Sequence, residues 1–231
     1  VLSLPDGGVW VGRPAPDVAR EPDRLTALQA LAELAATALL TARRLDEARG
    51  AELPFWSPDS RRIGFMQPET GKIKTVAAAG GRAEVVTDFG QIRGAVWTPS
   101  NTILFAGASG PIRQVAATGG GPSPGASVDP KRQEVGHRFP ALLPDGDHFL
   151  YAALPGKEGK FDIFAGSLKD ATHQTRVFIG AMDAAPVYAD PGYLLYARQG
   201  VLAAVPFDAA ALKITGDPIL LEDEPASILN P

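Results

Sequence analysis

A segment with the spacing of a catalytic serine lies near the middle of the chain. Residues 121–125 read Gly-Pro-Ser-Pro-Gly, which matches the Gly-x-Ser-x-Gly pattern of a nucleophile elbow. Such an elbow needs a strand that leads directly into a helix, and a proline on each side of Ser123 forbids that geometry. The sequence therefore predicts an edge loop at Ser123 and no serine nucleophile.

The histidines and the acidic residues show no metal-binding pattern. His137, His148 and His173 lie on separate elements, and no two of them have the spacing of a helical metal site. Because lone histidines are usually structural, we expect a structural role for His137, which precedes Arg138. Residues 145–147 read Asp-Gly-Asp, but a calcium ion needs six or more oxygen ligands, so this segment is expected to form a turn.

Other apparent motifs also have simpler explanations. The triplet Asp-Phe-Gly at residues 88–90 spells a protein-kinase motif, yet no His-Arg-Asp run or kinase glycine loop precedes it. The chain has no cysteine, which excludes thiol nucleophiles, disulfides and cysteine-bound metals. From this inventory we expect no catalytic, cofactor-binding or metal-binding residue and no cofactor, and we expect the isolated chain not to be an enzyme.

The composition bounds the class of protein. The 231 residues include 22 basic and 26 acidic ones, for a net charge of -4, and no basic cluster suited to nucleic acid. The most apolar window, residues 27–42, is too short and too polar to span a bilayer, so no membrane segment is expected. Glycine (25) and proline (21) are abundant, which predicts frequent turns and few long helices.

An internal repeat organises most of the chain. Each unit has an apolar or aromatic pair, then a proline beside Asp, Ser or Gly, then a β-rich run that ends in an aromatic residue. The four units are residues 55–65, 96–105, 141–151 and 187–196. Their prolines, Pro58, Pro99, Pro144 and Pro191, are 41, 45 and 47 residues apart. This period is typical of four-stranded β-propeller blades.

The repeat predicts an all-β fold of four-stranded antiparallel blades. Four blades are expected at about residues 51–92, 93–137, 138–183 and 184–224, within a ring of four, five or six blades. Proline with Asp or Gly sets the tight turns, and Phe55-Trp56, Val96-Trp97 and Val187-Tyr188 are expected in the core. An incomplete ring would expose blade edges, which predicts either self-association or closure by pairing of residues 1–11 with residues 219–221.

The first fifty residues fit the repeat less well. Residues 1–50 form either a degenerate first blade or a strand pair followed by a helix. Apolar residues recur at helical spacing between Asp23 and Arg49, without an internal glycine or proline, which favours a helix at about residues 24–49.

Two stretches resemble a known type of repeat. Residues 133–151, which include Gly136-His137-Arg138-Phe139 and Leu143-Pro144-Asp145-Gly146, and residues 54–65, Pro-Phe-Trp-Ser-Pro-Asp-Ser-Arg-Arg-Ile-Gly-Phe, resemble TolB-like repeats. Such repeats build the WD-like propeller that follows the kinase domain of many bacterial serine/threonine protein kinases. The resemblance covers about residues 52–221 and implies a ring of six to eight blades in a multidomain protein.

The resemblance implies a sensor or binding module. We expect this chain to bind a protein, a peptide or a small ligand at the propeller face, as the C-terminal part of a bacterial serine/threonine kinase. Two alternatives remain open, the propeller domain of a prolyl-oligopeptidase-like hydrolase and a free-standing periplasmic TolB-like protein. The location would be extracytoplasmic if a kinase domain and a transmembrane helix precede the chain, and cytoplasmic otherwise.

Overall fold

A computed structural model describes residues 2–3, 9–10, 50–156, 161–172, 174–182, 186–198 and 201–221. In the first fifty residues it shows β1 (Leu2–Ser3) paired antiparallel with β2 (Val9–Trp10). The helix expected at about residues 24–49 lies outside the described residues. Among those that are described, no helix is long and apolar enough to cross a membrane.

Four antiparallel sheets follow one another along the chain. The first has β3 (Glu52–Trp56), β4 (Arg62–Gln67), β5 (Lys72–Ala77) and β6 (Glu84–Asp88). The second has β7 (Ile92–Trp97), β8 (Thr102–Gly107), β9 (Ile112–Ala116) and β10 (Ser123–Ala126). The third has β11 (Glu134–Leu142), β12 (His148–Pro155), β13 (Phe161–Ser167) and β14 (Gln174–Met182). The fourth has β15 (Val187–Ala189), β16 (Tyr193–Arg198) and β17 (Val201–Asp208), with β18 (Lys213–Ile214) and β19 (Ile219–Leu220) both paired to β17.

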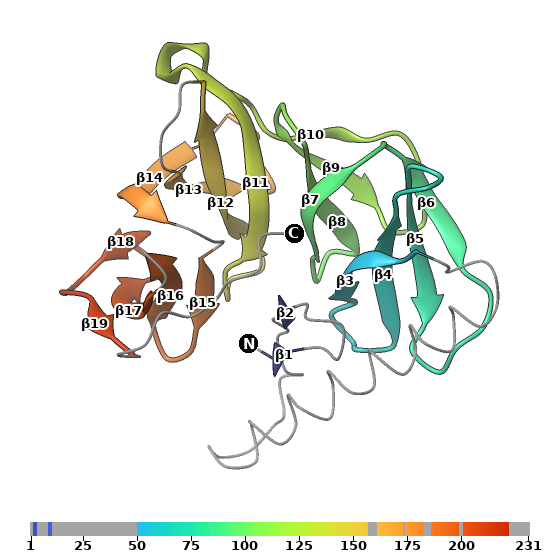
Figure 1. Cartoon of the computed structure of the whole chain (residues 1–231), viewed down its shortest axis with the longest axis horizontal. Helices are drawn as coiled ribbons and strands as arrows, with labels where there is room; N and C mark the ends of the chain where they lie inside the picture. The colour runs from blue at the N-terminus through green and yellow to red at the C-terminus, as the bar shows by residue number, and fades with distance from the viewer. Residues whose placement is uncertain are drawn as a thin grey trace.

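The sheets are arranged around a common centre, each with its first strand innermost (Figure 1). Strand β3 packs against β7, β7 against β11, and β11 against β15. This radial order of antiparallel sheets, three of four strands and one of five, confirms the all-β propeller expected from the repeat.

The core lies between neighbouring sheets. The second strands of the first three sheets, β4, β8 and β12, are buried on both faces, so their sequences are almost continuously apolar rather than alternating. One buried cluster joins the first and second sheets and includes Phe55, Ile73, Trp97 and Phe105. Others join the second sheet to the third and the third to the fourth. Each fully buried large apolar side chain contributes about 1.5–3 kcal/mol, so the packing between the sheets stabilises their radial order.

The proline turns occupy equivalent positions, as predicted. Each joins the innermost strand of a sheet to its second strand. Ser57 Oγ accepts the backbone N–H of Arg62 at 2.8 Å, and Thr98 Oγ1 accepts that of Thr102 at 3.2 Å. In the third sheet Asp145 Oδ1 accepts the N–H of His148 at 2.9 Å. A side-chain oxygen therefore closes each turn, as is typical of Ser, Thr and Asp in turns.

The closure expected from pairing of residues 1–11 with residues 219–221 is not seen among the described residues. Strand β19 pairs with β17, with Leu220 opposite Ala203 and Ile219 opposite Ala204, whereas Leu2–Ser3 pairs with Val9–Trp10. Strand β17 is eight residues long and β18 covers only one end of it, so β19 extends the same sheet. This local pairing costs less loop-closure entropy than pairing with a strand about two hundred residues away.

Candidate functional site

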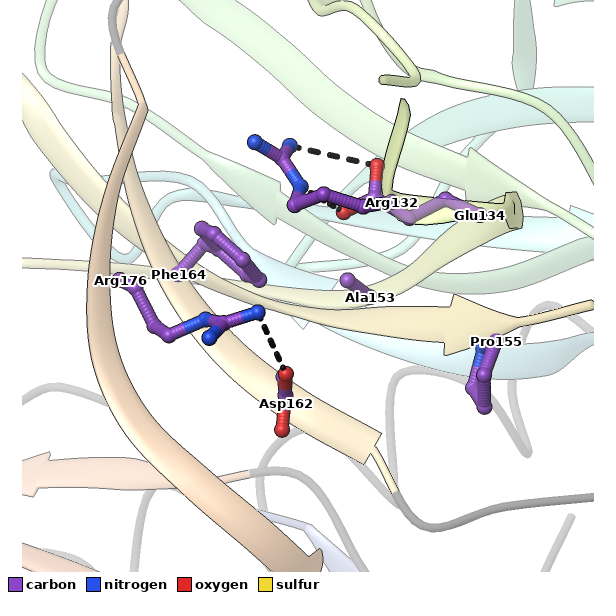
Figure 2. A pocket seen from close by; sticks show the side chains of 7 residues that line it. All are labelled: Arg132, Glu134, Ala153, Pro155, Asp162, Phe164 and Arg176. Carbon is purple, nitrogen blue, oxygen red and sulfur yellow. Dashed lines mark hydrogen bonds and ion pairs between the residues drawn. The ribbon is translucent and has the colours of Figure 1, made fainter. Parts of the chain in front are cut away.

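A small hollow with charged walls lies on the third sheet. We call it the blade-3 pocket (Figure 2), and it has a volume of about 90 Å³. Its lining residues are Arg132, Glu134, Ala153, Pro155, Asp162, Phe164 and Arg176. Asp162 and Phe164 are two residues apart on β13 and therefore share a face, and Arg176 on β14 lies directly opposite Phe164.

Arg132 is positioned by a short 3-10 helix, Pro130–Arg132, that precedes β11. Asp129 caps this helix by accepting the backbone N–H of Lys131 at 2.9 Å. The next residue, Gln133, has a left-handed backbone with φ of 55°, which turns the chain into β11. The Arg132 guanidinium then donates from Nε to Glu134 Oε1 at 2.5 Å and from Nη1 to Asp129 Oδ2 at 3.0 Å. Two carboxylates thus fix its orientation.

Glu134 is a buried carboxylate with several donors. Its side chain is 4% exposed and accepts the backbone N–H of Asp129 at 2.9 Å in addition to Arg132. Burial raises the pKa of Glu134, but the hydrogen bonds from Arg132, the Asp129 backbone and His137 outweigh burial and hold this pKa below its ordinary value. Glu134 is therefore an anion at neutral pH, and it holds Arg132 and His137 in place.

His137 lies behind Glu134 and is fully buried. Its Nδ1 accepts the backbone N–H of Ile112 at 3.4 Å, so Nε2 carries the proton and donates to Glu134 Oε2 at 3.2 Å. Burial lowers the pKa of His137, and Glu134 opposes this only in part. With both ring nitrogens engaged and no exposed edge, the neutral imidazole links β9 to β11.

Two guanidinium groups approach the ring of Phe164. The Arg132 Cζ lies 4.5 Å from the ring centre and the Arg176 Cζ lies 5.5 Å from it. Arg176 also pairs with Asp162 at 3.1 Å, and its side chain is 45% exposed. As Figure 2 shows, both carboxylates and both guanidinium groups border the hollow, with Phe164 between them. The pocket thus offers fixed donors, fixed acceptors and one aromatic surface to a polar group of a ligand.

A second hollow, of about 240 Å³, lies between the turns of the first and second sheets. It is lined by Ser57, Pro58, Asp59, Arg62, Trp97, Thr98, Pro99 and Asn101. Trp97 Nε1 donates to Asn101 Oδ1 at 3.0 Å, and Asp59 accepts from Ser57 Oγ at 2.7 Å. These four side chains therefore hydrogen-bond within the hollow itself.

The remaining sequence candidates are dispersed over the fold. Ser123 is exposed and begins β10, which continues as a strand, so no elbow is formed there. Asp145 binds its own turn and the ring of His148, while Asp147 pairs with Lys169 at 3.2 Å. His173 lies outside the described residues. In the described part of the chain, no three His, Asp or Glu side chains form a group suited to a metal ion.

The Asp-Phe-Gly triplet at residues 88–90 lies where the first sheet ends. Phe89 packs edge-on against Phe105 with ring centres 4.7 Å apart, and Gly90 has a φ of 84°. The triplet therefore connects two blades.

Sequence reasoning missed the blade-3 pocket. Arg132, Asp162 and Arg176 belong to no motif and are brought together only by the register of β11, β13 and β14. The available signal was the alternation of Asp162 with Phe161 and Ile163, which marks a polar position inside a strand.

Comparison with solved structures places the fold. The chain is similar to TolB from Acinetobacter baumannii, with 17% identity, 69% of this chain and 42% of that chain covered, and a TM-score of 0.57. It is also similar to the calcium-binding protein regucalcin from Agrobacterium tumefaciens, with 15% identity, 74% and 58% covered, and a TM-score of 0.57. A gluconolactonase from Xanthomonas campestris matches with 11% identity, 68% and 57% covered, and a TM-score of 0.55.

This chain spans between 42% and 58% of the length of those three solved chains. No protein-family model and no curated protein sequence matches it.

These comparisons correct the expectation that the chain is not an enzyme. Proteins with the same arrangement of sheets include the gluconolactonase and an oligogalacturonate lyase whose structure contains manganese. A propeller can assemble a site from loops of different blades, and a search for short motifs does not detect such a site. The lack of short catalytic motifs in the sequence therefore does not exclude catalysis by this chain. At these identities the likeness concerns the fold, which is a β-propeller of TolB-like type.

Proposed function

We propose that this chain is a binding module that recognises a protein or peptide partner through the blade-3 pocket. The observation that carries the proposal is the placement of Arg132 and Arg176 around the ring of Phe164, with Glu134 and Asp162 beside them. Ion pairs hold all four charged groups, so the pocket is preorganised before a partner arrives.

The chemistry of the pocket suits a polar peptide segment. Guanidinium groups donate to backbone carbonyl oxygens or to acidic side chains, and an aromatic face accepts an apolar stem beside them. At about 90 Å³ the hollow accommodates one side chain rather than a whole small-molecule cofactor, which typically occupies about 300–1,000 Å³. A partner would therefore place one anchoring side chain in the pocket and spread over the surrounding surface.

A phage-displayed peptide library selected on the full chain tests this proposal. Selected peptides should lose at least about tenfold in affinity for Arg176→Ala, which removes one cation and its ion pair to Asp162. The matched control is Arg61→Ala, which removes an exposed arginine from a turn in the first sheet and should leave affinity unchanged. An empty selection, or peptides that bind Arg176→Ala as tightly as the unmodified chain, would refute it.

The setting proposed for this module is a larger protein in which it follows a serine/threonine kinase domain. Support comes from residues 133–140 and 143–151, which resemble the kinase-linked repeats. The test is to read the full-length coding sequence for a kinase domain and a transmembrane helix upstream. A hydrolase domain downstream would favour the prolyl-oligopeptidase-like alternative instead.

A further inference from the structure

Two arginines occupy the same repeat position on neighbouring innermost strands. Arg93 on β7 and Arg138 on β11 each lie six residues before the turn proline of their sheet, Pro99 and Pro144. Strands β7 and β11 pack against each other beside the centre of the propeller (Figure 1). The repeat therefore places two guanidinium-bearing residues side by side on the inner wall.

The backbone is bulged at both positions. Register shifts interrupt the pairing of β7 between Ile92 and Ala95 and that of β11 between Arg138 and Ala141. The residue after each arginine has a positive φ, 107° at Gly94 and 55° at Phe139. Strand β3 has the same bulge, with a φ of 49° at Leu53, so the bulge belongs to the repeat, and it changes the direction of the side chains beside it.

The two bulges are in direct contact. A Cβ atom built on Gly94 would lie 3.0 Å from the Cα of Phe139, a tighter approach than nine in ten Cβ contacts in proteins. The strands therefore come unusually close at the residues next to the arginines.

These cations lack counter-charges in the described part of the chain. The Arg138 Nε atom is buried and has no hydrogen-bond partner there, and neither arginine forms an ion pair with a described carboxylate. On the neighbouring strand β3 the same repeat position is occupied by a carboxylate, Glu52. Glu52 forms no ion pair with Arg93 and therefore does not neutralise it. Burial, and then the charge of Arg93, lower the pKa of Arg138. Two neighbouring cations with a buried unused donor are costly to maintain unless an anion binds them.

We propose that Arg93 and Arg138 form a binding site for an oxyanion, a carboxylate or a phosphate group, on the inner wall of the propeller. The planar forks of two guanidinium groups match the oxygen atoms of such a group and would satisfy the Arg138 Nε donor. This site is separate from the blade-3 pocket and does not depend on the function proposed for that pocket.

Nuclear magnetic resonance of the ¹⁵N-labelled full chain tests the site directly. Inorganic phosphate and succinate are titrated separately at constant ionic strength while the arginine Nε–H signals are recorded. A saturable shift of the Arg138 signal is expected. Saturation by phosphate assigns a phosphate ligand, and saturation by succinate alone assigns a carboxylate, and either result supports the site.

Variants decide whether the two arginines carry the binding. Arg93→Gln and Arg138→Gln should each weaken binding at least about tenfold, since each removes a charge-assisted donor pair. Arg61→Gln makes the same change of net charge at an exposed turn of the first sheet and should stay within about twofold of the unmodified chain. If Arg138→Gln does not fold, Arg93→Gln and Arg138→Lys carry the test. No saturable shift, or a loss with Arg61→Gln but not with Arg93→Gln, would overturn the proposal.

Discussion

The backbone N–H of Ile112 donates to Nδ1 of His137, so a buried imidazole joins the outer part of the second sheet to the innermost strand of the third. The same junction holds a parallel bridge between Gly110 and Gly136, with the N–H of His137 donating to the Gly110 carbonyl at 2.9 Å. Backbone and side chain thus fasten one blade to the next at a single place.

His137→Gln should lower the free energy of unfolding by about 1–3 kcal/mol, because the buried N–H of Ile112 loses its acceptor. Urea unfolding followed by circular dichroism measures this loss. His148→Gln is the matched control, because His148 pairs with Asp145 at the surface and an exposed pair contributes about 0.2–1 kcal/mol. Equal losses in the two variants would contradict the linking role of His137.

The stability of the fold should decrease in acid, in two stages. The folded-state pKa values of His137 and Glu134 both lie below their ordinary values, mainly through burial for His137 and through hydrogen bonds that outweigh burial for Glu134. Below each ordinary value the unfolded chain binds more protons than the folded chain, so the free energy of unfolding falls with falling pH. The first loss should begin near the ordinary histidine value of about 6.5 and the second near the ordinary glutamate value of about 4.3.

Urea unfolding at a series of pH values measures this profile. A hydrogen bond from Ser57 lowers the pKa of Asp59. Burial raises the pKa of Asp145, but hydrogen bonds from His148 outweigh burial and lower it. Both aspartates therefore add to the second stage. His137→Gln should remove the first stage and retain the second. A first stage that survives in His137→Gln would assign it to another group.

Gly94→Ala should destabilise the fold by at least about 2 kcal/mol, because a left-handed backbone disfavours a Cβ and overpacking adds to the cost. The added atom would meet the Phe139 Cα at 3.0 Å, and the backbone φ is 107°. Gly121→Ala is the control, since nothing lies within 4 Å of its Cβ position, and it should change stability by less than about 0.5 kcal/mol. Thermal melting compares the two variants. Similar melting temperatures would show that the close contact between the two bulges does not contribute to stability.

Tyr151→Phe should leave stability unchanged or raise it by up to about 1–2 kcal/mol, because it removes a buried hydroxyl that has no partner among the described residues. Phe65 and Phe105 hold the equivalent position in the first two sheets, so phenylalanine fits this core. Urea unfolding gives the difference. A loss above about 1 kcal/mol would show that the hydroxyl makes a stabilising contact.

Local chemistry made much of the fold predictable. Pro58, Pro99 and Pro144 each fix a backbone angle beside residues that accept turn hydrogen bonds, so the turns could be placed from a few neighbouring residues. The buried second strands could be predicted because a short apolar run between two turns is typical of a buried strand. The bulges were not visible, since Leu53 and Phe139 are not residue types that favour the positive φ that they adopt.

The candidate sites depend on register and could not be predicted. Arg132 and Arg176 are 44 residues apart, and they meet at Phe164 only because β13 and β14 pair with Phe164 opposite Arg176. A shift of one residue in that pairing would carry Arg176 to the other face of the sheet. The single aspartate within the apolar strand 161–165 indicated a polar neighbour but not which one.

Each sheet of the propeller comes from one continuous stretch of chain, as from Glu52 to Asp88 in the first. Every pairing within a sheet therefore closes a short loop, and such contacts form early and quickly. A sheet can form soon after its own stretch leaves the ribosome, before the next stretch has been synthesised. Each finished sheet then presents its apolar face to the one that follows, so the order of synthesis is also a workable order of assembly.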